Sequence, residues 1–137
     1  MKYLSDYTEE ATTALFKETG TFFAFGNKQF DEQKKEGVEY VSLGAGTVCP
    51  KDKAKEFIER LEAIGAEGIK ADLADNGKKG VINRELGNHE YCITHDITDT
   101  ASALSGYGIT DEEIKAETAE YLRKYYEWEE AQERATA

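Results

Sequence analysis

The sequence predicts a mainly helical α+β protein, and three observations lead to that prediction. Apolar residues recur at helical spacing over several long stretches, short apolar runs bounded by glycine indicate strands, and a single proline interrupts the 137 residues. We expect four to six helices packed on a small antiparallel sheet of about three strands, formed by residues 21–25, 38–43 and 47–49. The length suits one globular domain over residues 1–137, with a frayed end after about residue 132.

The first part of the chain contains clear signals for the boundaries of helices and strands. Ser5 or Asp6 is the expected N-cap of a helix that runs to about Thr19 and ends at Gly20. The aromatic run at 21–25 lies between two glycines and predicts a buried strand. A short helix follows from Asn27.

The middle part predicts a hairpin and then helices. Gly44-Ala45-Gly46 is the expected turn between the strands at 38–43 and 47–49. A helix is expected from about Asp52 to the Asn76-Gly77 pair, with a Glu56–Arg60 ion pair at i, i+4. A second helix is expected from Lys78 to about Asn88, with its apolar side chains inward.

The last part predicts a short extended piece and two helices. Residues 91–94 fit an extended segment, and Asp96 or Thr98 begins a small helix. Thr110 and Glu113 have the spacing of a capping box, which predicts a final helix from Asp111 toward Glu133.

Charge and composition limit the classes of partner. The net charge is −11, so the surface repels nucleic acid and anionic membranes, and it suits a basic protein partner or simply solubility. Two cysteines and no signal peptide fit a reducing cytosol, and no apolar run reaches the length of a membrane span.

Residues 81–99 contain both histidines and several carboxylates. If the chain doubles back there, Glu85, His89, His95 and Asp96 converge, and this set suits zinc or another divalent transition metal. The alternative is structural, since the next histidine after His89 is at i+6 and no HExxH motif is formed. Cys92 is either a nucleophile or, as we favour, a buried small hydrophobe. We therefore assign no catalytic residue and expect no cofactor.

An aromatic stripe lies on the acidic final helix, with Tyr121, Tyr125 and Trp128 at helical spacing. Such a stripe is either core, a helix–helix seam or a partner-binding face, because Tyr and Trp are favoured interface anchors. The third possibility includes self-association into a homo-oligomer.

Four segments resemble a family of small proteins of unknown function carried by phages, plasmids and other mobile elements of gut and related Firmicutes. They are FFAFGNKQFDE at 22–32, SLGAGTVCPKD at 42–52, NRELGNHE at 83–90 and GYGITDEEI at 106–114. The resemblance implies a cytoplasmic accessory protein in a bacterial host. It also implies a non-enzymatic binder or inhibitor of host or defence proteins, with anti-CRISPR proteins and nucleic-acid mimics among the examples. The alternatives are a small metal-dependent hydrolase and a structural homo-oligomer.

Overall fold

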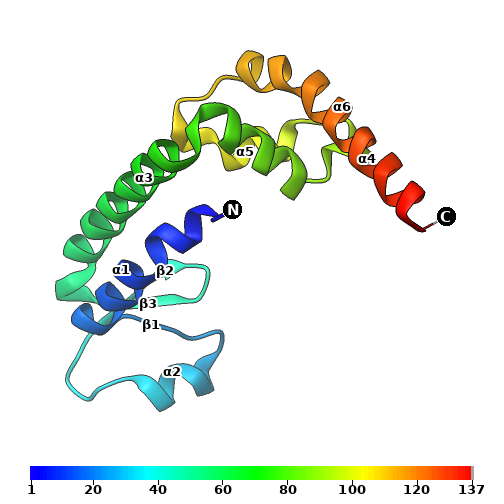
Figure 1. Ribbon diagram of the computed structural model, residues 1–137. Helices are drawn as coiled ribbons and strands as arrows, with labels where there is room; N and C mark the ends of the chain where they lie inside the picture. Colours follow the sequence, from blue (N-terminus) through cyan, green and yellow to red (C-terminus); the bar gives the residue numbers. More distant parts are fainter. Residues whose placement is uncertain (137) are drawn as a thin grey trace. The chain divides into compact units, whose positions relative to one another are not determined.

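The computed structural model describes residues 1–136 and has the predicted mainly helical α+β fold (Figure 1). The elements in order are α1 (Leu4–Thr19), β1 (Phe22–Phe23), α2 (Asn27–Gln33), β2 (Tyr40–Gly44), β3 (Thr47–Pro50), η1 (Lys51–Lys53), α3 (Ala54–Asn88), α4 (Tyr91–Thr94), α5 (Thr98–Ala103), η2 (Ser105–Tyr107) and α6 (Asp111–Thr136). The chain divides into two compact units. One is Lys2–Lys70, and the other runs from Ala71 onward and includes Met1.

The sheet lies in the unit Lys2–Lys70 and has the order β1-β3-β2, with both pairings antiparallel. The predicted hairpin is confirmed, with Val41 opposite Cys49 and a bulge between Ser42 and Gly44. Gly46 in the turn has a φ of 75°, and a β-carbon there would lie 2.3 Å from the Phe25 ring. Only glycine fits this position without moving that ring.

The core of this unit joins α1, the hairpin and α3. Leu15, Cys49 and Phe57 are buried, and Phe16, Leu43, Ala54 and Ile64 pack against them. Gly68 lets α1 approach α3 closely, because a β-carbon at Gly68 would lie 2.4 Å from the Thr8 methyl group. The predicted Glu56–Arg60 ion pair is confirmed at 3.6 Å.

Two predictions for this unit are wrong. The segment 21–25 is not a buried strand, because β1 is an edge strand of two residues, and Phe23 and Phe25 are 52% and 74% exposed. Helix α1 begins earlier than expected, with Tyr3 as its N-cap. Asp6 lies inside the first turn, where its carboxylate accepts the Tyr3 backbone N–H at 2.8 Å.

The predicted break at Asn76-Gly77 is confirmed. Gly77 has φ 69° and ψ 166°, so α3 consists of two helical stretches separated by this residue. The second stretch belongs to the unit from Ala71 onward, where Val81, Ile82 and Leu86 are buried as predicted. Leu104 and Ile114 are also buried in this unit.

The prediction of an extended segment at 91–94 is wrong, because these residues form the single helical turn α4. No strand lies beside these residues in this unit of the described chain, so their backbone groups form local hydrogen bonds instead of strand pairing. The Thr94 N–H donates to the Glu90 carbonyl, and the His95 N–H donates to the Tyr91 carbonyl. Glu90 and His95 bracket the turn in left-handed conformations, with φ of 56° and 52°.

The start of α6 confirms the predicted capping box. The Glu113 N–H donates to the Thr110 hydroxyl at 3.2 Å, and the Thr110 N–H donates to the Glu113 carboxylate at 3.3 Å. The helix continues to Thr136. Among the described helices, none combines the length and the apolar character that crossing a membrane requires.

Candidate functional site

Helices α4 and α6 present a group of aromatic side chains that we call the aromatic face. It consists of Tyr91, Tyr121, Tyr125 and Trp128. The ring centroids of Tyr91 and Tyr121 are 6.2 Å apart, and those of Tyr125 and Trp128 are 5.9 Å apart. The predicted stripe of Tyr121, Tyr125 and Trp128 is thus joined by an aromatic residue from α4.

Cys92 supplies the contact between the two halves of the aromatic face. Burial raises the pKa of Tyr121, and the nearby Cys92 thiol raises it further. A hydrogen bond with the same thiol raises the pKa of Tyr125. Both phenols are therefore neutral at physiological pH and serve as hydrogen-bond donors or acceptors.

The aromatic face becomes more exposed toward the end of α6. Tyr121 and Tyr125 are half-buried, whereas Trp128 is 57% exposed. Ile93 of α4 is 75% exposed in the same unit. A tryptophan this open to water has no role in the core, and it leaves an apolar surface available for a partner.

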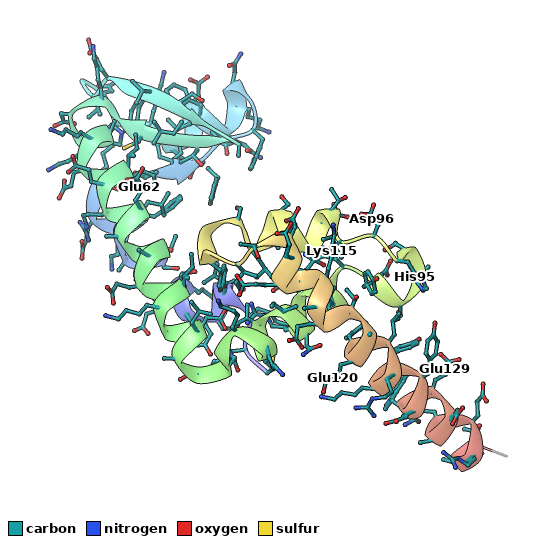
Figure 2. All side chains as sticks on the ribbon, turned by 90° about the horizontal axis from the view of Figure 1, so that it is seen from above. Glu62, His95, Asp96, Lys115, Glu120 and Glu129 are labelled. Atoms are coloured by element: carbon teal, nitrogen blue, oxygen red, sulfur yellow. The ribbon has the colours of Figure 1, made fainter. Side chains whose placement is uncertain are left out.

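Carboxylates surround the exposed tryptophan. We call the group Glu127, Glu129, Glu130 and Glu133 the acidic end of α6, and all four side chains are exposed. Figure 2 shows Glu120 and Glu129 projecting from different sides of this helix. Arg123 pairs with Glu127 at 2.8 Å, which leaves three carboxylates of the acidic end with no ion pair among the described residues. The end of α6 is thus both aromatic and anionic.

The predicted metal ligands are only partly brought together. The Nε2 atom of His89 lies 3.3 Å from a Glu85 carboxylate oxygen. His95 instead stacks on the Tyr91 ring, with a centroid distance of 5.7 Å. Asp96 accepts the backbone N–H of Thr98 at 2.9 Å and so supports the start of α5. Within residues 1–136, no three His, Cys, Asp or Glu side chains form a group that could hold a metal ion. A metal role for these residues stays a prediction.

A buried polar network lies in the unit from Ala71 onward. Arg84 forms two hydrogen bonds with Asp72, at 2.7 and 3.0 Å, and the Tyr107 hydroxyl donates to Asp72 at 2.6 Å. The Nε atom of Arg84 also donates to Glu85 at 2.9 Å. Asp72 is 0% exposed. The network therefore links α3 on both sides of Gly77 to η2.

Every carboxylate oxygen of Asp72 has a donor, which explains how a charge is tolerated there. Burial alone would raise the pKa of Asp72, but hydrogen bonds from Arg84, Tyr107 and Asn76 hold it below its ordinary value. Burial, together with the bond to Asp72, raises the pKa of Tyr107 to about 12. We assign the network a structural role, because its charged groups are closed off from solvent.

Sequence reasoning found Glu85 but missed Asp72, Arg84 and Tyr107. A weak signal exists, because Arg84 lies three residues after the buried Val81 and so shares its helix face. A charged residue in phase with an apolar stripe indicates a buried partner. The sequence does not reveal which partner, since Asp72 and Tyr107 are 35 positions apart.

The fold and this site define a small helical α+β protein that presents an aromatic, anionic helix surface. The chain belongs to a family of unknown function, DUF7659, which matches residues 4–128. Trp128 is the last matched residue, so the aromatic face lies within the match. Searches of curated proteins and of solved structures find no match to this chain.

Proposed function

We propose that this protein is a non-enzymatic binding module that docks the aromatic face and the acidic end of α6 onto a basic surface of a partner protein. The observation that carries the proposal is the exposure of Trp128 among exposed carboxylates, three of which form no ion pair among the described residues. Tryptophan and tyrosine supply most of the binding energy at protein interfaces, whereas exposed charges steer association and fix orientation.

The partner class that fits this chemistry is a nucleic-acid-binding protein of a bacterial host. Lysine and arginine side chains that normally contact phosphates would meet the carboxylates of α6, and Trp128 would fill an apolar or cationic pocket beside them. On this proposal the protein is an inhibitor that occupies a nucleic-acid site, in the cytoplasm of a host that carries the mobile element. CRISPR effectors belong to this partner class.

The experiment is a quantitative pull-down from host lysate over a salt series from about 50 to about 500 mM, followed by competition with duplex DNA against each captured protein. We expect a basic partner that is released by salt and that binds this protein and DNA exclusively. A partner that binds DNA and this protein at the same time would overturn the proposal that the protein occupies a nucleic-acid site. The absence of any salt-sensitive partner would overturn it as well.

The aromatic contribution is tested with Trp128→Ala, for which Phe25→Ala is the matched control. Both are exposed aromatic residues, but Phe25 lies in the other unit. We expect Trp128→Ala to weaken binding by at least about 30-fold, the value for a loss of about 2 kcal/mol at a hot spot. Phe25→Ala should leave the affinity unchanged.

The charge contribution is tested with the triple variant Glu129→Gln, Glu130→Gln and Glu133→Gln. This variant should associate more slowly with the partner, and its association rate should depend less on salt concentration, because steering charges act mainly on the association rate.

The control triple variant removes the same net charge elsewhere, with Glu9, Glu62 and Glu67 changed to Gln. These three side chains are exposed in the unit Lys2–Lys70. Equal effects of the two triple variants would show that only net charge matters, which contradicts docking through α6. Self-association abolished by Trp128→Ala would instead assign the aromatic face to a homo-oligomer.

A further inference from the structure

Three lysines from separate parts of the chain line one hollow in the unit Lys2–Lys70. Lys17 lies near the end of α1, Lys35 follows α2, and Lys53 belongs to η1. The hollow has a volume of about 300 Å³. In a protein with a net charge of −11, this concentration of ammonium groups runs against the overall charge.

Lys17 and Lys35 form no ion pair with any other residue in the described part of the chain, and Lys53 is 3.7 Å from Glu56 in an exposed pair. The three ammonium groups at the hollow therefore have little compensating negative charge from ion pairs. An exposed pair such as Lys53–Glu56 contributes little, about 0–1 kcal/mol.

Two carboxylates also line the hollow, and one of them is already engaged. Arg60 donates a hydrogen bond to Glu18, so the charge of Glu18 is compensated from the neighbouring helix. Asp52 remains, and three ammonium groups outnumber it.

Tyr40 adds a neutral donor at the same place. Its hydroxyl oxygen accepts the Lys35 backbone N–H at 3.0 Å, so its own proton is free to be donated. This bond also fixes the backbone at Lys35, which lies in the loop before β2.

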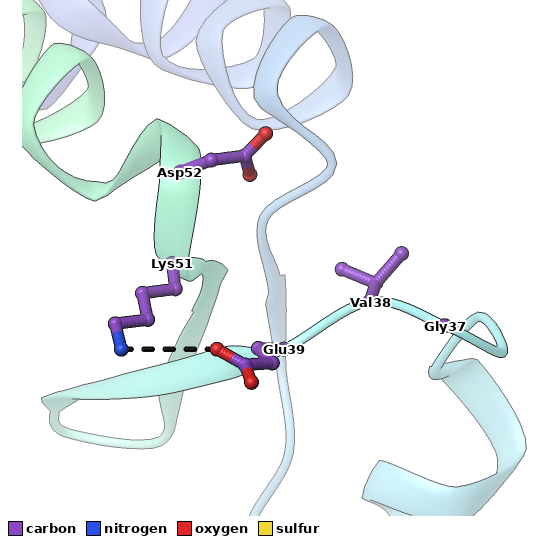
Figure 3. Close-up of a pocket in the computed structure, with 5 residues that line it drawn as sticks. All are labelled: Gly37, Val38, Glu39, Lys51 and Asp52. Atoms are coloured by element: carbon purple, nitrogen blue, oxygen red, sulfur yellow. Dashed lines mark ion pairs between the residues drawn. The ribbon is translucent and has the colours of Figure 1, made fainter.

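A second hollow shares Val38 and Asp52 with the first but offers no free cation (Figure 3). Its lysine, Lys51, pairs with Glu39 at 3.7 Å. Figure 3 shows the Asp52 carboxylate directed away from this pair. Of these two hollows, only the one that includes Lys17 and Lys35 is lined by lysines without an ion pair among the described residues.

We propose that this hollow binds a small, multiply charged anion of the phosphate class. Three ammonium groups and a phenol match the several acceptor oxygens of such an anion, and the anion would supply the negative charge that these lysines lack. The volume suits a group of the size of pyrophosphate. This inference does not rest on the proposed function, which concerns the other unit.

The experiment is a titration of the full chain with inorganic pyrophosphate at constant ionic strength, followed by amide chemical shifts and calorimetry. We expect saturable binding with shifts at Gly20 and Lys35, two residues that line the hollow. The triple variant Lys17→Gln, Lys35→Gln, Lys53→Gln should bind at least about tenfold more weakly, because it loses three charge-assisted contacts.

The matched control changes Lys28, Lys55 and Lys70 to Gln, which alters the net charge equally at exposed sites outside the hollow. It should retain full affinity. If the first triple variant does not fold, the single variant Lys35→Gln replaces it, since this loop position leaves helices and strands intact. No saturable shift up to about 10 mM pyrophosphate, or equal weakening in both triple variants, would overturn the site.

Discussion

At the scale of single residues, the feature with the largest effect on stability is the buried ion pair of Asp72 and Arg84. Buried ion pairs combine a large desolvation penalty with a strong attraction, so removing one partner destabilises far more than removing both. The surface pairs of this chain, such as Arg123–Glu127 at 2.8 Å, lie in water and contribute little by comparison.

Asp72→Ala should lower the free energy of unfolding by about 3–5 kcal/mol, because it leaves the Arg84 guanidinium buried with one of its two carboxylate partners gone. The double variant Asp72→Leu, Arg84→Met should recover part of this loss, since the buried guanidinium is removed and Glu85 keeps its contact with His89 at 3.3 Å. Urea denaturation followed by circular dichroism measures both. The control Glu127→Gln should change stability by less than about 1 kcal/mol. A double variant as unstable as the single one would contradict this account.

Tyr107 should be the last tyrosine to ionise. Burial and the hydrogen bond to Asp72 raise its pKa to about 12, above the ordinary value of 10.0. Because the folded pKa is raised, the stabilisation by this hydroxyl is fully present below pH 10 and is lost as the pH rises through about 12.

The measurement is a titration of tyrosinate absorbance in the wild type and in Tyr107→Phe. The variant should lack the latest-ionising group, and at neutral pH it should be less stable by about 1–3 kcal/mol, since Asp72 loses a buried donor.

At the scale of the elements, two of the five glycines of α3, Gly65 and Gly77, have opposite conformational requirements. Gly77 has a φ of 69° and a ψ of 166°, a region that L-residues with a β-carbon rarely adopt. Gly65 lies in regular helix, and a β-carbon there meets nothing within 4 Å. The same substitution should therefore have effects of opposite sign.

Gly77→Ala should destabilise the protein by about 1–3 kcal/mol through backbone strain, or else straighten the break. Gly65→Ala should stabilise it by about 0.5–1 kcal/mol, because alanine loses less backbone entropy in a helix. Thermal denaturation compares them directly. Similar melting temperatures for the two variants would show that the conformation at Gly77 is not maintained in solution.

At the scale of the whole molecule, net charge and the aromatic face act against each other. The charge of −11 at pH 7 opposes contact between copies, whereas the exposed Trp128 favours it. Lowering the pH toward the sequence pI of about 4.7 removes the repulsion.

We therefore expect self-association to increase as the pH falls from about 7 to about 5 at fixed ionic strength, as measured by sedimentation velocity. Trp128→Ala should reduce the increase, and Phe25→Ala, which changes a still more exposed ring in the other unit, should not. A reduction by both variants would indicate association through general apolar exposure rather than through α6.

The sequence by itself determined the features that depend on neighbouring residues. The α+β class, the hairpin at Gly44-Ala45-Gly46, the break at Gly77 and the capping box of Thr110 were all predicted, because turns and caps act over a few positions. Fraying at the end of α6, the single domain and the functional assignments stay predictions.

Only the tertiary structure decided which side chains meet water and which charges meet each other. The aromatic run at 21–25 became an exposed edge because few neighbours cover it. Segment 91–94 became a helical turn because no strand of its unit pairs with it. Asp72 contacts Arg84, which is 12 positions away in the sequence, and Tyr107, which is 35 positions away. Pairing depends on how distant segments pack, and local sequence patterns indicate which face of an element is buried but not which distant residues it meets.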